Sequence, residues 1–130
     1  MKKITNLFGI IFVAVGILGF IPGITSDGYL LGIFEVNALH NIIHLATGII
    51  ALMVAGSHSK SKAFFKIFGV VYGLVTVVGF LHGHSVFGLI GVNVADNLLH
   101  LVITVVALVL GFGGSKHSSS MPMSGNQMQM

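Results

Sequence analysis

The chain contains no cysteine among its 130 residues, and it carries very little charge. The absence of cysteine excludes disulfides, iron–sulfur clusters and thiolate zinc sites, and it leaves the redox compartment open. Only 7% of the residues are charged, whereas soluble domains carry about 25%. A chain with so few charges cannot surround a core with a water-facing surface, so the composition argues against a soluble helical bundle.

Hydrophobic residues make up 55% of the chain and gather in four long apolar runs. With its flanks, each run reaches roughly 17–20 residues, the length at which a helix crosses a bilayer. The sequence therefore predicts an all-α membrane protein with four transmembrane helices. The basic N-terminus resembles a signal peptide, but no A-x-A-like cleavage site follows it, so we expect a retained first helix. The runs are 7–21, 42–56, 67–81 and 98–114.

Charged residues separate along the chain by sign. All six basic residues are lysines, and they lie before the first run, between the second and third runs, or after the fourth. The positive-inside rule then places both termini and the 57–66 loop in the cytoplasm, and the 22–36 and 82–96 connections outside. We expect a multi-pass protein of the cell (inner or plasma) membrane, with the lipid bilayer as its partner. Six lysines do not make a nucleic-acid surface, so no nucleic-acid partner is expected.

Two parts of the sequence repeat each other. Residues 30–56 align with residues 86–112 at a constant spacing of 56, and residues 8–20 align with residues 68–80 at a spacing of 60. Such self-similarity indicates that one helical hairpin occurs twice. The identical pairs include Gly32 and Gly88, Val36 and Val92, Asn37 and Asn93, Asn41 and Asn97, and His44 and His100.

The duplication predicts the domain organisation. A transmembrane domain over 1–114 would contain repeat 1 (7–56) and repeat 2 (67–113), followed by a disordered, Ser/Met-rich cytoplasmic tail over 115–130. Because each repeat has two helices, both repeats have the same orientation, and a pseudo-twofold axis along the membrane normal would relate them. A Met-rich tail can also bind Cu⁺, although tails of this composition are more often simply disordered.

The octets NALHNIIH (37–44) and NVADNLLH (93–100) place one polar pattern at the start of the second and fourth helices. At 100° per residue, the polar residues of each octet fall within an arc of about 100° on one helix face. In lipid, such a polar stripe has to face protein or a wet cavity. The stripe residues are Asn37, His40, Asn41 and His44 in the first copy, and Asn93, Asp96, Asn97 and His100 in the second.

Helix capping explains part of each stripe. Asn37 and Asn93 are favourable N-cap residues, and Asp96 occupies the N3 position of a capping box. His40 occupies the same position in the first copy, where an acid would serve better. Capping does not reach the stripe residues that lie deeper in each helix.

Three interpretations of the deeper residues stay open. The first is interhelical hydrogen bonding, since Asn and His hold membrane helices together modestly. The second is a site for a divalent metal or a haem, with His44 and His100 as ligands and His40 and Asp96 as neighbours; Zn²⁺, Cu²⁺ or Fe²⁺ would tolerate these donors. The third is a proton or solute path, for which four helices are few, so this interpretation favours a homo-oligomer.

Other residues point less clearly to a function. His82 and His84 form an H-x-H motif near the same side, but we expect them to be solvated loop residues. An enzyme is not expected, because the chain has no cysteine nucleophile, no Ser–His–Asp arrangement and no phosphate-binding loop. The alternatives to a binding protein are therefore a proton- or solute-path component of a transporter and a purely structural or accessory membrane protein.

Four motifs resemble the signature blocks of a bacterial membrane family catalogued as domain of unknown function 4383. They are G-F-x-P-G at 19–23, L-L-G-x-F at 30–34, L-H-N-x-x-H at 39–44 and A-D-N-x-x-H at 95–100. The resemblance covers roughly residues 7–113 and implies a four-helix integral membrane protein of bacteria or archaea, with no assigned activity. The GVNV at 91–94 departs slightly from the family's pattern just before the last motif. Function has to be argued from the site itself.

Overall fold

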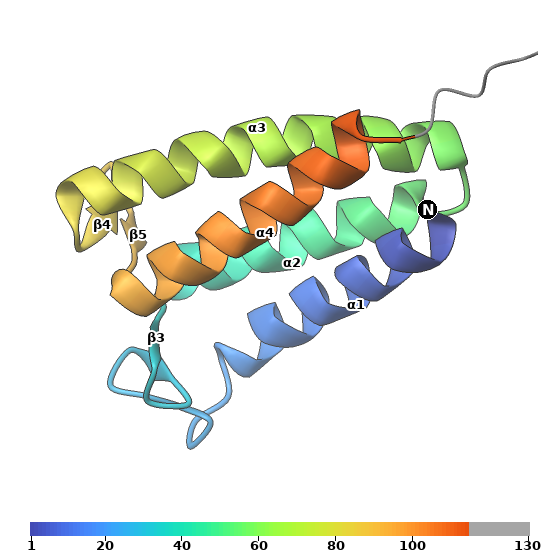
Figure 1. Cartoon of the computed structure of the whole chain (residues 1–130). Coiled ribbons are helices and arrows are strands. Elements are labelled where there is room, and N and C mark those ends of the chain that lie inside the picture. Colours follow the sequence, from blue (N-terminus) through green and yellow to red (C-terminus); the bar gives the residue numbers. More distant parts are fainter. Residues whose placement is uncertain (115–130) are drawn as a thin grey trace, which may run out of the picture.

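The computed structural model describes residues 1–114, and the predicted tail lies outside this part of the chain. The described residues form a mostly helical fold of four helices (Figure 1). Short strands in the two longer connections correct the expectation of an all-α chain. The helices are α1 (Lys2–Leu18), α2 (Ala38–Val54), α3 (His58–His82) and α4 (Val94–Phe112), and the strands are β1 (Thr25–Ser26), β2 (Tyr29–Leu30), β3 (Phe34–Glu35), β4 (Ser85–Val86) and β5 (Ile90–Gly91).

Each helix begins before its apolar run does, because polar residues near the N-terminus continue or cap the helix. The largest difference is in α3, which starts at His58 and has 25 residues. The side chain of Ser57 caps this helix by accepting a hydrogen bond from the backbone N–H of Lys60. The prediction of a loop over 57–66 is therefore wrong, because most of this segment is the first part of α3.

The strands lie in two small antiparallel sheets at one end of the helices, here called the strand end (Figure 1). β1, β2 and β3 pair antiparallel in the connection between α1 and α2, and β4 pairs with β5 between α3 and α4. The β2–β3 and β4–β5 hairpins each turn through two residues with positive φ, Leu31 (54°) with Gly32 (70°) and Phe87 (55°) with Gly88 (70°). Two consecutive positive φ angles are typical of the type I′ turns that join antiparallel strands.

The opposite end of the bundle carries the N-terminus and the turn between α2 and α3, and is called the lysine end (Figure 1). Lysines of the described residues lie at this end, in the first turn of α1 and the first part of α3. The three acids, Asp27, Glu35 and Asp96, lie at the strand end. The separation of charge along the sequence is therefore also a separation in space.

Glycines let the two helices of each helical hairpin (α1 with α2, and α3 with α4) approach closely. A Cβ added at Gly9 of α1 would lie 2.8 Å from Cγ of Leu52 in α2, and one at Gly69 of α3 would lie 2.7 Å from Cδ2 of Leu108 in α4. Small residues at such crossings allow backbones to pack at short distance. The pairs α1 with α2 and α3 with α4 are therefore held by the same kind of contact, a glycine of one helix against a leucine of the other.

An aromatic cluster joins the two hairpins to each other. Phe12 of α1 packs edge-to-face on Phe68 of α3, with ring centroids 5.6 Å apart, and Phe68 stacks on Tyr72 at 4.1 Å. Phe65 and Ala107 complete this buried core. Edge-to-face and offset-stacked pairs are the favourable arrangements of aromatic rings.

The outward faces of the helices are apolar, and the inward faces of α2 and α4 are polar or small. In α2 the buried residues are His40, Asn41, His44, Gly48 and Ala51, whereas isoleucines and leucines point outward. By length and composition, α3 and α4 are apolar enough to cross a membrane, and α2 is a shorter apolar helix. The predicted polar stripes therefore face the interior of the protein, except for the N-cap residues Asn37 and Asn93, which are exposed or partly buried.

Candidate metal site

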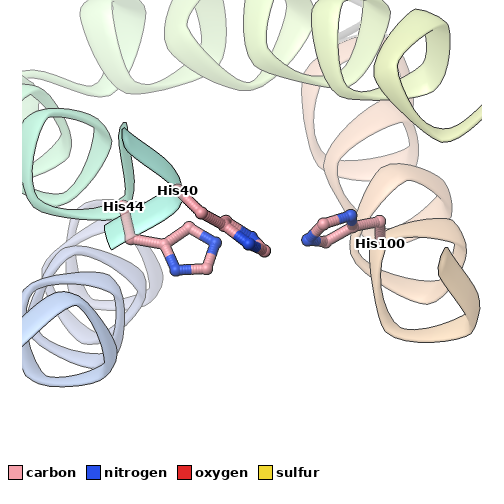
Figure 2. A group of neighbouring side chains, drawn as sticks. All are labelled: His40, His44 and His100. Atoms are coloured by element: carbon pink, nitrogen blue, oxygen red, sulfur yellow. The ribbon is translucent and has the colours of Figure 1, made fainter. Parts of the chain in front are cut away.

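Three histidines meet at the strand end of the bundle. His40 and His44 lie on α2, and His100 reaches toward them from α4 (Figure 2). Each offers one imidazole nitrogen, and these three nitrogens all lie within 4.8 Å of one another. The side chains are 2%, 8% and 4% exposed, respectively. The structure therefore brings together the two predicted ligands and one of their two predicted neighbours.

N-caps position the histidines along both helices. Asn37 begins α2 and accepts a hydrogen bond from the backbone N–H of His40 at 2.9 Å. Asn93 begins α4 and accepts one from Asp96, whose carboxylate accepts in return from the backbone N–H of Asn93. These are the predicted caps, and the second pair is a complete capping box.

The same two asparagines also hold the β2–β3 and β4–β5 turns over the site. Nδ2 of Asn37 donates to the carbonyl oxygen of Leu89 at 3.0 Å, and Nδ2 of Asn93 donates to that of Ile33 at 2.8 Å. Each asparagine thus caps its own helix and anchors the strand turn of the other helical hairpin. Leu89 and Ile33 occupy equivalent positions in the aligned sequences, so the exchange is reciprocal.

A backbone carbonyl sets the protonation of one histidine. Nδ1 of His40 lies 2.8 Å from the carbonyl oxygen of Gly91 in β5. A carbonyl oxygen can only accept, so Nδ1 of His40 carries the proton and Nε2 keeps its lone pair. Metal-binding histidines commonly donate their second N–H to a backbone carbonyl or a carboxylate in this way.

Aromatic rings support the other two histidines. Phe12 lies edge-on to His44, with centroids 5.3 Å apart, and Tyr72 lies edge-on to His100 at 5.4 Å. Phe12 and Tyr72 are also equivalent in the alignment of 8–20 with 68–80. The packing restricts both imidazoles to orientations that keep them near the centre of the bundle.

Several buried polar atoms in this region have no hydrogen-bond partner among the described residues. They include Nε2 of His40 and the Nδ1 atoms of His44 and His100. An unpaired buried polar atom costs about 1–3 kcal/mol. The histidine cluster therefore has free nitrogen donors where a ligand would be favourable.

The remaining stripe residues lie outside this cluster. The Asn41 and Asn97 side chains pack against Gly19 and Gly79, in the space that a Cβ at either glycine would occupy. Within residues 1–114 their Oδ1 atoms have no conventional hydrogen-bond partner, and at such short range a glycine Cα–H can be a weak donor. Asp96 is buried and engaged in its capping box, and it is not one of the three grouped residues.

The two other predicted histidines are also separate from the site. His82 ends α3, and His84 lies in the connection to β4; both are exposed. Their exposure agrees with the prediction of solvated residues, although His82 belongs to the end of a helix and not to a loop.

Two apolar grooves reach the histidines from opposite sides. A groove of about 590 Å³ between α2 and α3 is lined by His40 and His100 at the strand end and by Lys60 at the lysine end. A groove of about 320 Å³ between α1 and α4 is lined by His44, His100 and Asp96. The cluster is therefore buried but adjoins two apolar spaces.

Sequence reasoning missed the groups that orient the histidines. The carbonyl of Gly91 carries no side-chain signal, so only the folded hairpin reveals it. Phe12 and Tyr72 could have been found, because aligned positions 60 residues apart both carry aromatic rings.

No curated protein and no solved structure matches the chain. A family model described as Domain of unknown function (DUF4383) matches residues 2–113. That match spans both hairpins, the three histidines and both N-cap asparagines. The chain therefore belongs to the DUF4383 family.

Proposed function

We propose that this protein is a four-span membrane protein that binds one transition-metal ion, with Zn²⁺ as the first ion to test, through His40, His44 and His100. The observation that carries the proposal is the group of three buried imidazole nitrogens within 4.8 Å of one another. Imidazole is a good ligand for Zn²⁺ and for copper, iron and nickel ions. Because the chain has no cysteine, thiolate ligands are excluded and histidine is the strongest side-chain ligand for such an ion that the chain offers.

The donor geometry fits a small ion with modest adjustment. Zn–N bonds of about 2.0–2.1 Å place the nitrogens of a tetrahedral site roughly 3.4 Å apart. Side-chain rotations that move each nitrogen by roughly one ångström would therefore bring the three nitrogens around an ion. His40 is already oriented, because its Nδ1 is committed to Gly91 and only Nε2 is free to bind.

The third histidine favours a single ion over a haem. A haem with two histidine ligands would need His44 and His100 on opposite faces of a porphyrin. The ring of His40 lies 4.6 Å from that of His44 and 5.6 Å from that of His100, and the latter two are 6.2 Å apart, so the three rings form a compact triangle. Insertion of a flat macrocycle between them would require His40 to move away.

The membrane arrangement in this proposal has both termini in the cytoplasm and the strand end outside. Its support is the apolar outward surface, the gathering of lysines at one end and the length of the apolar helices α3 and α4. We also propose that the two hairpins arose by duplication. Equivalent N-caps, equivalent turn residues and the reciprocal Asn37 and Asn93 hydrogen bonds support this origin.

Metal analysis of the purified protein tests the site. Protein in detergent, equilibrated with Zn²⁺ and freed of excess ion, should retain about one ion per chain. His44→Ala and His100→Ala should lose it, whereas His82→Ala and His84→Ala should retain it. These controls remove exposed histidines from the same end of the protein.

Two results would contradict the proposal. One is wild-type protein that binds no Zn²⁺, Cu²⁺ or Fe²⁺. The other is equal metal retention in the cluster variants and the control variants. A Soret band that depends on His44 and His100 would instead support the haem alternative.

A further inference from the structure

A metal held by three histidines has an open position and an unbalanced charge. Three-ligand zinc sites leave a fourth position for water or substrate. Neutral imidazoles do not offset the charge of a divalent ion, and burying an uncompensated charge is costly. An anionic fourth ligand would therefore be strongly favoured at this site.

The chain does not supply that anion from within the cluster. Asp96 is the only acid on the polar stripes, and its carboxylate already accepts the backbone N–H of Asn93 at 2.9 Å. Neither Asp96 nor Glu35 of β3, whose side chain lies near Gly91, belongs to the group of three nitrogens. The anion would therefore come from outside the protein.

The larger groove offers such a ligand a route to the open position. The α2/α3 groove is lined by His40 and His100, and both side chains are more than nine-tenths buried. Nε2 of His40 and Nδ1 of His100 have no partners among the described residues. The α1/α4 groove is smaller and contains the Asp96 carboxylate, which would repel an anion.

The shape and lining of the α2/α3 groove indicate the class of molecule. Apart from the residues at its two ends, its lining is mainly aliphatic and aromatic. Along α2 it extends from His40 to Val54, which corresponds to about 21 Å of helix. That is longer than half of a hydrocarbon core of about 30 Å. An acyl chain would fit this groove lengthwise, with its polar end at the histidines.

We propose that the fourth ligand is the carboxylate of a long-chain fatty acid whose acyl chain lies in the α2/α3 groove. The inference rests on the proposed metal site. His40 and His44 lie in the first two turns of α2 and His100 lies in the second turn of α4, close to the membrane surface in the proposed arrangement. A fatty acid of the outer leaflet already holds its carboxylate at this depth and its chain along the helices, so it could enter sideways without reversing.

Cobalt-substituted protein provides the test, because visible Co²⁺ bands respond to a change of ligand. The protein, in detergent and loaded with Co²⁺, is titrated with palmitate, acetate or hexadecanol. Palmitate should change the spectrum at a concentration at least about tenfold below that of acetate, since its chain adds apolar burial. Hexadecanol, which has the chain without the negative charge, should leave the spectrum unchanged.

Matched valine variants locate the chain. Val71 lines the α2/α3 groove and Val106 lines the α1/α4 groove, and they are 51% and 49% exposed. Val71→Phe should raise the half-saturating palmitate concentration at least about tenfold, equivalent to about 1.4 kcal/mol. Val106→Phe should leave it unchanged. Ile67→Phe, which fills the same groove as Val71→Phe, is a second blocking variant, and Co²⁺ stoichiometry reports whether each variant is folded.

The possible failures are distinguishable. Wild-type protein that binds no Co²⁺ or Zn²⁺ contradicts the metal site before any lipid is added. Protein that binds Co²⁺ but gives equal responses to palmitate and acetate, or responds to hexadecanol, overturns the fatty-acid inference alone. Loss of the palmitate response in Val106→Phe but not in Val71→Phe or Ile67→Phe overturns the choice of groove. Loss of Co²⁺ binding in Asp96→Asn would instead identify an internal fourth ligand and overturn the inference.

Discussion

Nδ1 of His40 donates a hydrogen bond to the carbonyl oxygen of Gly91, across the two hairpins, at 2.8 Å. This contact joins α2 to β5 and so holds the β4–β5 hairpin over the start of α2. It also leaves Nε2 of the same ring unprotonated, buried and without a partner. One hydrogen bond therefore has both a structural and a chemical consequence, and substitutions can separate them.

His40→Asn should keep the structural contact and lose the ligand. An asparagine Nδ2 can take the place of Nδ1 and donate to Gly91, whereas nothing replaces Nε2. We expect Zn²⁺ affinity to fall at least about tenfold, or about 1.4 kcal/mol, with metal-free stability close to wild type. His40→Ala should lose the contact too and cost about 1–3 kcal/mol, because the carbonyl is left unpaired.

Zinc titration and thermal unfolding of the metal-free protein measure these two effects separately. Equal zinc affinity in wild type and His40→Asn would show that Nε2 is not a ligand. Equal unfolding temperatures for His40→Asn and His40→Ala would show that the Gly91 contact contributes little.

Asn37 variants should distinguish capping from hairpin anchoring. Asn37→Asp keeps an oxygen for the backbone N–H of His40 but loses the donor to Leu89. Asn37→Ala loses both, and cap removal alone typically costs about 0.5–2 kcal/mol. We expect the alanine variant to be the less stable of the two.

Hydrogen exchange in residues 86–91 provides the second measurement. Both variants should show faster exchange there, because the turn has lost its hydrogen bond from Asn37. Unchanged exchange in Asn37→Asp would mean that the hairpin is held without this contact.

Gly79→Ala should destabilise the protein through a steric clash with Asn97. A Cβ at Gly79 would enter the space of the Asn97 amide, and overpacking typically costs about 1–3 kcal/mol. Gly19→Ala should have a similar effect through Asn41. Gly56→Ala is the control, because nothing lies within 4 Å of a Cβ at that position.

Thermal unfolding in detergent measures all three glycine variants. The double variant Gly79→Ala with Asn97→Ala should recover part of the loss, since the smaller side chain makes room for the added methyl group. If Gly56→Ala is as unstable as the other two, the clash is not the cause.

Membrane topology can be tested with single cysteines, because the natural chain contains none. Ser26 lies at the strand end and Ser59 at the lysine end, and both are exposed. A membrane-impermeant maleimide should label Ser26→Cys in intact cells and Ser59→Cys only after lysis. The opposite pattern would reverse the proposed orientation, and labelling of both in intact cells would contradict it.

The sequence alone was sufficient to predict the helices, the capping residues and the inward polar faces. Each depends on local chemistry or on helical periodicity: Asn37 and Asn93 cap because their side chains reach N–H groups three residues on. Helix starts were predicted less well, as α3 shows, because a helix can continue through lysines beyond its apolar run. The strands were missed because two-residue strands give no periodic pattern.

Only the tertiary structure decided what the polar stripes contain. Periodicity places His40, His44 and Asp96 on comparable faces, but it cannot tell which side chains meet across two helices. The fold groups His40 with His44 and His100 and keeps Asp96 in its cap, because Gly91 reaches His40 while Asn93 engages the carboxylate. Contacts between residues about 50 positions apart depend on how the hairpins pack, and local sequence does not encode that packing directly.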